Sequence, residues 1–224
     1  MARFSRIEVA KAMEETGIIP VFYHPDAQTC FNVVEACYKG GLRVFEFTNR
    51  GDFAHEVFAT IYKQLFKAYP EVILGVGSVI DAGTASLYMQ LGANFIVSPV
   101  LNPEMAKVCN RRKVLWSPGC GSVSEISQAE ELGAEIVKIF PGQQVGGPEF
   151  VAAVKGPMPW SSIMPTGGVE PTRENLTLWF KSGVTCVGMG SKLITSDVIR
   201  ESNYPLLQEK AATAVKLLKE IRGK

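Results

Sequence analysis

The sequence lacks the features that mark several large classes of protein. Its 23 lysines and arginines almost balance its 22 aspartates and glutamates, and no basic stripe extends beyond the run Arg111, Arg112 and Lys113. Nucleic-acid-binding proteins usually carry a clustered basic surface, so we expect no nucleic-acid partner and interpret that run as a solvated turn. The N-terminus has no signal-peptide apolar region, and no apolar run reaches the roughly 18 residues of a membrane helix. We therefore expect a soluble protein without a membrane partner.

Metal-binding and disulfide patterns are also missing. The five cysteines include no C-x-x-C pair, and their odd number argues against a disulfide framework. His55 and Glu56 do not complete a zinc-protease motif. We expect no metal and no other cofactor, and a reducing cytoplasm is the simplest location.

Short apolar segments alternate with amphipathic ones along the whole chain. Strands are predicted at 18–23, 44–48, 73–79, 95–99, 114–118, 136–140, 163–166 and 186–190. Amphipathic helices are predicted at 28–38, 55–68, 82–91, 123–132, 171–181 and 206–221, with an extra helix before the first strand at 3–15. Glycine pairs or single glycines precede several strands, which is typical of helix ends.

This alternation predicts an α/β fold, specifically a (β/α)8 TIM barrel with an extra N-terminal helix that caps its bottom. An open doubly wound sheet would more often carry a glycine-rich dinucleotide loop after its first strand. Here the first strand is followed by the segment YHPD at 23–26. No linker or composition shift interrupts the pattern, so we predict a single domain over residues 1–224.

Lys138 is the most informative residue, because it stands inside the apolar run IVKIF at 136–140. A buried ammonium is costly, so such a lysine reaches solvent along its stem, pairs with a carboxylate, or loses its proton. The neutral amine is a nucleophile. Taken alone, the lysine is more often structural than catalytic.

Active sites of TIM barrels lie at the carboxyl ends of the strands. Alternation along the second strand places Glu46, Thr48 and Arg50 on one face. Glycine-rich segments end the seventh and eighth strands, where barrels of this class commonly bind phosphate on backbone N–H groups. The sequence therefore predicts a phosphorylated substrate, although Glu46 and Arg50 could also form a structural ion pair.

These residues belong to motifs that span nearly the whole chain. They are VFEFTNR at 44–50, GVGSV at 75–79, IVSP at 96–99, SPG at 117–119, VKIFP at 137–141 and PTGGV at 165–169. In order and spacing they resemble the 2-keto-3-deoxy-6-phosphogluconate (KDPG) and 4-hydroxy-2-oxoglutarate (KHG) aldolases. The resemblance implies a class I aldolase that releases pyruvate, and a homotrimer.

The resemblance also implies roles for individual residues. Lys138 would form a Schiff base with the C2 carbonyl of a 2-keto acid, while Glu46 would transfer protons. Arg50 and Ser78 would hold the substrate carboxylate, and Pro99 would lie against bound pyruvate. The residues that would bind the rest of the substrate, including its phosphate, are Thr166, Gly167, Gly168, Gly190 and Ser191.

Several alternatives remain open at this level. Ser78, Ser117 and Thr166 could be ordinary turn hydroxyls, and for Ser117 we prefer that interpretation. Gln143 stands where many family members carry an acid, so the sequence does not decide between the gluconate and galactonate series or KHG. A metal-dependent phosphosugar decarboxylase or epimerase, and a noncatalytic sugar-phosphate sensor, are the competing functions.

Overall fold

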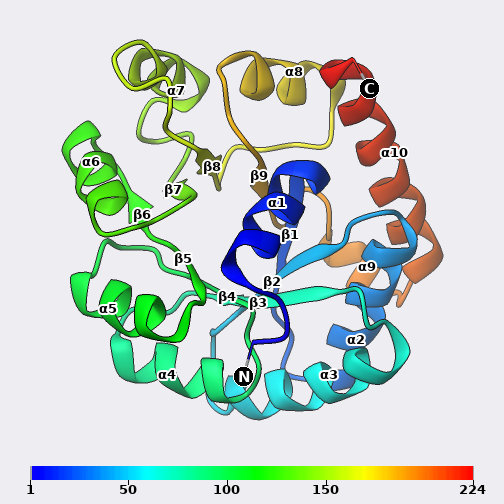
Figure 1. Cartoon of the computed structure of the whole chain (residues 1–224). Helices are drawn as coiled ribbons and strands as arrows, with labels where there is room; N and C mark the ends of the chain where they lie inside the picture. The colour runs from blue at the N-terminus through cyan, green and yellow to red at the C-terminus, as the bar shows by residue number, and fades with distance from the viewer. Residues whose placement is uncertain (1, 224) are drawn as a thin grey trace.

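Parallel strands and helices alternate along residues 2–223, which are the residues that the computed structural model describes (Figure 1). Every strand pair in the barrel is parallel, because a helix or a connecting segment returns the chain to the same end before the next strand. The strands are β1 (Ile18–Phe22), β2 (Val44–Thr48), β3 (Ile73–Gly77), β4 (Phe95–Val97), β5 (Leu115–Ser117), β6 (Gly119–Cys120), β7 (Val137–Ile139), β8 (Ile163–Pro165) and β9 (Val187–Met189).

The sheet curls into a barrel. Six strands pair in the order β5-β4-β3-β2-β1-β9, and three pair in the order β6-β7-β8. The chain runs directly from β5 into β6, and a bridge between Thr166 and Gly188 joins β8 to β9. The predicted TIM barrel is thus confirmed, with its fifth strand split at Pro118, a residue that has no N–H to donate to a ladder.

Helices surround the barrel, and the seven predicted ones are present with bounds shifted by a few residues. α1 begins at Arg6 rather than at residue 3, because Ser5 and Glu8 form a capping box there. These seven helices are α1 (Arg6–Thr16), α2 (Ala27–Lys39), α3 (Ala54–Ala68), α4 (Ala82–Gln90), α6 (Val123–Glu131), α8 (Arg173–Lys181) and α10 (Tyr204–Arg222).

Three further helices were not predicted: α5 (Pro103–Arg112), α7 (Gly147–Lys155) and α9 (Ser196–Arg200). α5 is strongly polar, and both α5 and α7 carry a proline in their first turn. The interpretation of Arg111, Arg112 and Lys113 as a turn was wrong for the two arginines. They form the last turn of α5, and Lys113 caps it. No helix within residues 2–223 is long and apolar enough to cross a membrane.

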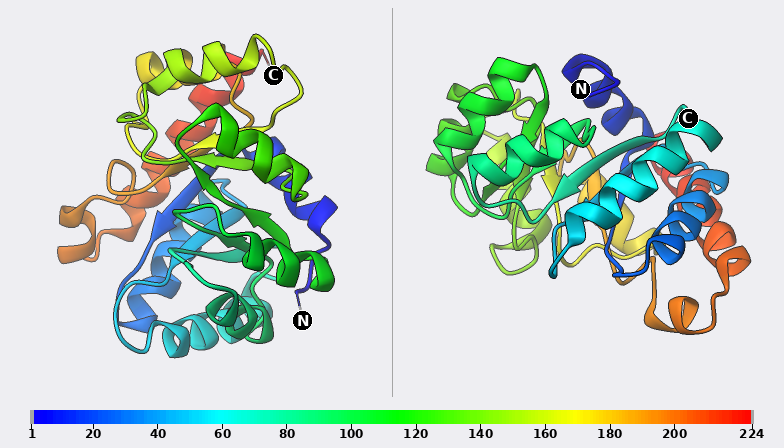
Figure 2. Two further views of the ribbon diagram at one scale, coloured as in Figure 1. Left: turned by 90° about the vertical axis from the view of Figure 1, so that its left-hand side faces the viewer. Right: turned by 90° about the horizontal axis from the view of Figure 1, so that it is seen from below.

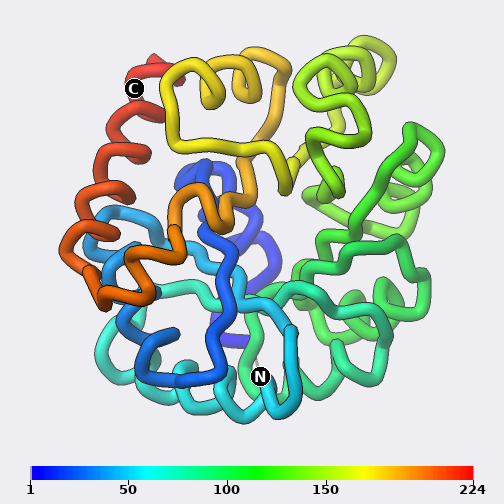
Figure 3. Tube along the Cα trace, turned by 180° about the vertical axis from the view of Figure 1, so that it is seen from behind, coloured from blue at the N-terminus to red at the C-terminus, as the bar shows by residue number. Residues whose placement is uncertain are grey.

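The barrel strands have an apolar core on each side. One lies between the strands and the outer helices, and the other fills the lumen. Val9, Ala12 and Met13 of α1 belong to the lumen core, so α1 closes the lumen from below, as predicted. Figure 2 places α1 and α9 at opposite ends of the barrel, and Figure 3 looks onto the end that α9 shares with the carboxyl ends of the strands.

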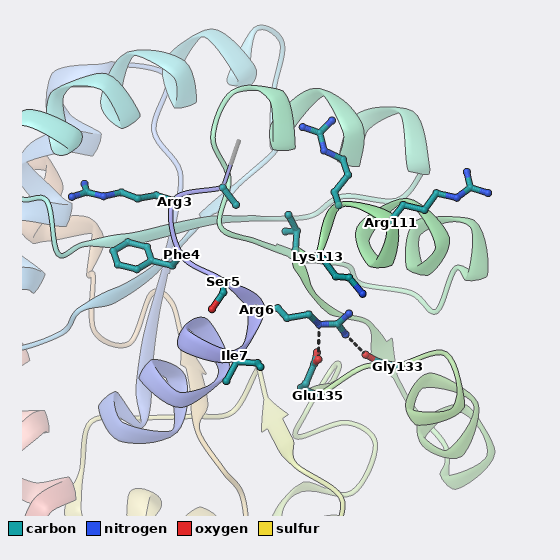
Figure 4. Close-up of a pocket in the computed structure, with 12 residues that line it drawn as sticks. Arg3, Phe4, Ser5, Arg6, Ile7, Arg111, Lys113, Gly133 and Glu135 are labelled. Atoms are coloured by element: carbon teal, nitrogen blue, oxygen red, sulfur yellow. Dashed lines mark hydrogen bonds and ion pairs between the residues drawn. The ribbon is translucent and has the colours of Figure 1, made fainter.

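Arg6 fastens α1 to the barrel. Its guanidinium pairs with Glu135 and donates a hydrogen bond to the Gly133 carbonyl, at 2.6 Å (Figure 4). It also donates a hydrogen bond to Asn110 Oδ1, at 2.9 Å. A cavity of about 1050 Å³ lies beside it. Arg3 and Arg111 point away from Arg6 in this view, whereas the Lys113 side chain runs toward it. This cavity lies at the barrel bottom, where TIM barrels carry stability rather than chemistry.

Candidate active site

The lumen changes from apolar to charged toward the carboxyl ends of the strands. Val44 and Ile136 belong to the lumen core. Glu46 follows Val44 by two positions along β2, and Lys138 of β7 follows Ile136, the residue before that strand, by two positions, so each charged residue lies on the face of its lumen neighbour. The strand period thus aims a carboxylate and an amine into one interior.

Glu46 and Lys138 form a buried pair. Lys138 Nζ lies 3.6 Å from Glu46 Oε1, and the two side chains are only 6% and 1% exposed. The carboxylate lies over Gly77 of β3, where any Cβ would overlap Oε1. Neither carboxylate oxygen has a hydrogen-bond partner within residues 2–223. The pair is therefore closely placed and buried, and both oxygens keep unused capacity to accept hydrogen bonds.

A second pair lies at the ends of β2 and β3. Arg50 Nε donates a hydrogen bond to Ser78 Oγ, at 3.3 Å. Ser78 has a φ of +59°, which is uncommon for a residue with a side chain and concentrates at functional sites. The terminal nitrogens of Arg50 have no partner among the described residues, so its planar fork is available to a carboxylate.

A cavity of about 790 Å³ opens beside Arg50, the one member of these two pairs that lines it. Its lining includes six of the predicted site residues: Arg50, Thr166, Gly167, Gly168, Gly190 and Ser191. Gly167 and Gly168 have φ values of +101° and +79°, which only glycine adopts at low cost, and this turn leaves backbone uncovered by side chains. Lys138, Glu46, Ser78 and Pro99 do not line this cavity.

Comparison with known proteins decides the family. The family model described as "Aldolase: KDPG and KHG aldolase" matches residues 9–209. The 2-dehydro-3-deoxy-phosphogluconate aldolase of Pseudoalteromonas atlantica is 30% identical over 217 residues, which cover 96% of this chain and 97% of that protein. The KHG/KDPG aldolase of Escherichia coli K12 is 30% identical over 207 residues, or 92% and 94% of the two chains.

This chain belongs to the KDPG and KHG aldolase family. A solved structure of the Legionella pneumophila KDPG aldolase, with pyruvate captured as a covalent carbinolamine intermediate, superposes with a TM-score of 0.83 at 26% identity. The superposition covers 92% of this chain and 97% of that one. The protein is accordingly a class I aldolase, an enzyme that breaks carbon–carbon bonds.

Pro99 and Ser117 of this aldolase also lie at or near the barrel lumen. The Pro99 carbonyl lies where a Cβ of Gly119 would fall, and Gly119 pairs in register with Lys138. Pro99 is therefore close to the strand of the lysine. Ser117 is fully buried, and its Oγ has no hydrogen-bond partner within residues 2–223. It follows Leu115 of the lumen core by two residues, so it faces the lumen and is not an exposed turn hydroxyl.

The aldolase cavity also includes residues that the sequence did not identify. Tyr23 lines it from the end of β1, while Lys192, Ser196 and Arg200 line it from the segment after β9. Lys192 directly follows Ser191, a predicted site residue, and this adjacency was the one feature of the sequence that could have identified Lys192. Ser196 and Arg200 lie on α9, whose five residues are too few to give a periodic pattern.

Other polar groups near the mouth have local partners. His24 Nδ1 accepts a hydrogen bond from the Asp26 backbone N–H at 3.1 Å, and His24 does not line the cavity. Burial raises the pKa of the Cys120 thiol to about 12, so this cysteine is protonated at neutral pH. Within residues 2–223, no three His, Cys, Asp or Glu side chains form a group that could hold a metal ion.

Proposed function

We propose that this aldolase acts in the cytoplasm, where it cleaves a 2-keto-3-deoxy-6-phospho sugar acid to pyruvate and glyceraldehyde 3-phosphate through an imine on Lys138. The observation that carries the proposal is the buried pair of Lys138 and Glu46, 3.6 Å apart. An amine that is 6% exposed beside an acid–base group suits imine chemistry, which needs both a nucleophile and a proton carrier.

The amine of Lys138 attacks the C2 carbonyl, and the resulting carbinolamine loses water to give a protonated imine. This cation accepts the electron pair of the C3–C4 bond as that bond breaks, while the C4 hydroxyl loses its proton and the aldehyde leaves. Protonation of the enamine at C3, followed by hydrolysis, releases pyruvate and restores the amine. Glu46 carries these protons, because its two free oxygens can take up and return a proton beside Lys138.

Binding groups fix the substrate on both sides of this centre. Arg50 and the Ser78 hydroxyl hold the carboxylate next to C2, and Pro99 packs against the pyruvyl portion. Thr166 and the backbone of Gly167, Gly168, Gly190 and Ser191 bind the distal end with its phosphate, which the glycine conformations leave accessible. Fixing both ends positions the carbonyl for attack.

The Escherichia coli relative is named a KHG/KDPG aldolase. On that basis we propose that 4-hydroxy-2-oxoglutarate, which yields pyruvate and glyoxylate by the same steps, is a second substrate of this chain.

The test is a coupled assay for pyruvate with two variants. Lys138→Ala removes the nucleophile, so we expect cleavage to fall to background. Glu46→Gln keeps the amine but cannot accept a proton, so we expect kcat to fall roughly 10²–10⁴-fold while imine formation with pyruvate persists. Substantial cleavage by correctly folded Lys138→Ala would contradict the imine mechanism. Inactivation of the wild type by a chelator would instead favour a metal-dependent enzyme.

We propose further that the aldolase is a homotrimer. Four exposed apolar side chains follow consecutive strands at the barrel mouth: Phe53, Ile80, Val100 and Val123, here called the apolar rim. Exposed apolar side chains at the ends of neighbouring strands are suited to an interface with another protein chain, which supports association with further copies. Sedimentation should give three times the 24.4 kDa chain mass, and Ile80→Glu should lower it. A wild-type mass of one chain would contradict the trimer.

A further inference from the structure

The active-site cavity carries charge of one sign. Its charged lining residues are Arg50, Lys192 and Arg200, and no aspartate or glutamate lines it. The chain as a whole is almost neutral, with a formal net charge of +1, so this bias is local to the cavity. Such a cavity favours a substrate with more than one negative group.

The three cations lie on two flanks. β2 and β9 are the neighbours of β1 on opposite sides in the sheet. Arg50 follows β2, whereas Lys192 and Arg200 follow β9. An extended molecule that lies across the end of β1 therefore meets Arg50 on the β2 side, and Lys192 and Arg200 on the β9 side. Arg50 matches the keto acid's carboxylate, which leaves Lys192 and Arg200 for a second anionic group.

Lys192 and Arg200 are held by weak, exposed ion pairs. Lys192 Nζ lies 2.8 Å from Glu170 Oε1, and an Arg200 Nη2 lies 2.7 Å from Asp197 Oδ1 and 3.1 Å from Glu201 Oε1. The paired side chains are 40–68% exposed. Exposed pairs contribute little net energy, so a phosphate can compete for these cations at small cost. The same acids keep the long side chains beside the cavity when it is empty of substrate.

We infer that Lys192 and Arg200 are specificity-determining residues that make this aldolase select a 2-keto acid with a terminal phosphate over the same acid without it. The inference rests on the proposed function and extends it. Backbone N–H groups at Gly190 and Ser191 are neutral donors that a hydroxyl can also use. Two cationic side chains beside them add an attraction that only the anionic phosphate gains.

The experiment compares 2-keto-3-deoxy-6-phosphogluconate with 2-keto-3-deoxygluconate in steady-state cleavage. Lys192→Met and Arg200→Met keep the apolar stem and remove the charge. For each variant we expect kcat/KM for the phosphorylated substrate to fall about tenfold, mainly through KM, because one charge-assisted contact is lost. For the unphosphorylated substrate we expect a change of less than about twofold, since it makes no such contact.

Arg173→Met is the matched control, because Arg173 is an exposed, ion-paired arginine that does not line the cavity. It should leave both substrates unaffected. Equal losses on the two substrates, unchanged KM values in both cavity variants, or a wild type that prefers the unphosphorylated acid would each overturn the inference. Incubation with pyruvate followed by borohydride reduction distinguishes failure of this inference from failure of the proposed function. An adduct on Lys138 in the wild type alongside any of those results defeats only the specificity claim, whereas its absence defeats the imine mechanism.

Discussion

At the scale of single residues, the position of Glu46 depends on the lack of a side chain at Gly77. Glu46 reaches Lys138 only because β3 has glycine at position 77, directly beneath the carboxylate. Gly77 and Thr48 are partners in the β2–β3 ladder, so this close approach is fixed by strand register. The motif residues and the glycine therefore form one geometric unit.

Gly77→Ala should separate Glu46 from Lys138, because the new Cβ overlaps Oε1 of Glu46 and the carboxylate must move. A displacement of about 1 Å at a catalytic group can cost roughly 100-fold in rate, so we expect kcat to fall by about that factor. Steady-state kinetics of a variant with unchanged circular dichroism checks this.

Gly121→Ala is the control. A Cβ there meets its nearest atom, Val145 Cγ1, at 3.5 Å, which is an ordinary contact, and its φ is not positive. Activity should stay near that of the wild type. Equal activities of the two variants would show that Glu46 does not need its place above Gly77.

Sequence reasoning found the inner residues because strand period determines which way a side chain points. Glu46 and Lys138 are separated from lumen residues by two positions, and a period of two is visible in the sequence. Ser196 and Arg200 could not be found this way. Whether a residue after a strand turns toward the cavity depends on how its connecting segment folds, and that is a tertiary property.

At the scale of elements, capping residues fix where the outer helices begin. Asp81 starts α4 by accepting hydrogen bonds from the Thr84 N–H (2.8 Å) and hydroxyl (2.7 Å). These bonds favour the ionised carboxylate and hold the pKa of Asp81 below its ordinary value. Asp81 therefore stabilises the fold above its unfolded-state pKa, and this stabilisation is lost as pH falls through the lower folded-state pKa.

Asp81→Ala should lower the free energy of unfolding at pH 7 by about 1 kcal/mol, the usual cost of a lost N-cap. The difference from wild type should begin to shrink near pH 4, about the ordinary pKa of an aspartate, and should continue to shrink as pH falls through the lower folded-state pKa. Urea unfolding at pH 7 and pH 3 measures both. Glu209→Ala, which removes an exposed carboxylate from α10, serves as the control. A difference that stays constant with pH would contradict the role of the ionised cap.

Helix bounds were predicted best where a helix buries a wide apolar face. α2 and α3 have wide apolar faces and were predicted almost to the residue. α5 buries only Met105, Ala106 and Cys109, so its pattern was too sparse to identify from sequence. The break between β5 and β6 also escaped prediction, since Pro118 could equally have ended a strand.

At the scale of the whole molecule, the barrel buries every cysteine. All five thiols are buried and none forms a disulfide. Burial raises the pKa values of Cys30, Cys109 and Cys186 to about 12, and also raises that of Cys37. A thiol reacts mainly as its thiolate, which is scarce far below its pKa.

The native aldolase should therefore resist iodoacetamide at pH 8 and keep its activity, whereas all five cysteines should be alkylated in urea. Intact-protein mass spectrometry counts the additions. Rapid alkylation of a native cysteine with loss of activity would show that the barrel opens more readily than its packing indicates.

The alternation of eight strand segments with helices was enough to predict the barrel, because parallel strands joined by helices have few arrangements that bury both faces. The lumen core and its closure by α1 follow from the same pattern. Single-domain organisation over residues 1–224 and the trimer remain predictions, since neither follows from the packing of one chain.

The central claim is that Lys138 forms the imine, and its most direct test is to incubate the protein with pyruvate, reduce with borohydride and map the added mass by peptide mass spectrometry. We predict a reduced pyruvyl adduct on the peptide that contains Lys138, and its loss in Lys138→Ala. No adduct, or an adduct on another lysine such as Lys192, would contradict the account.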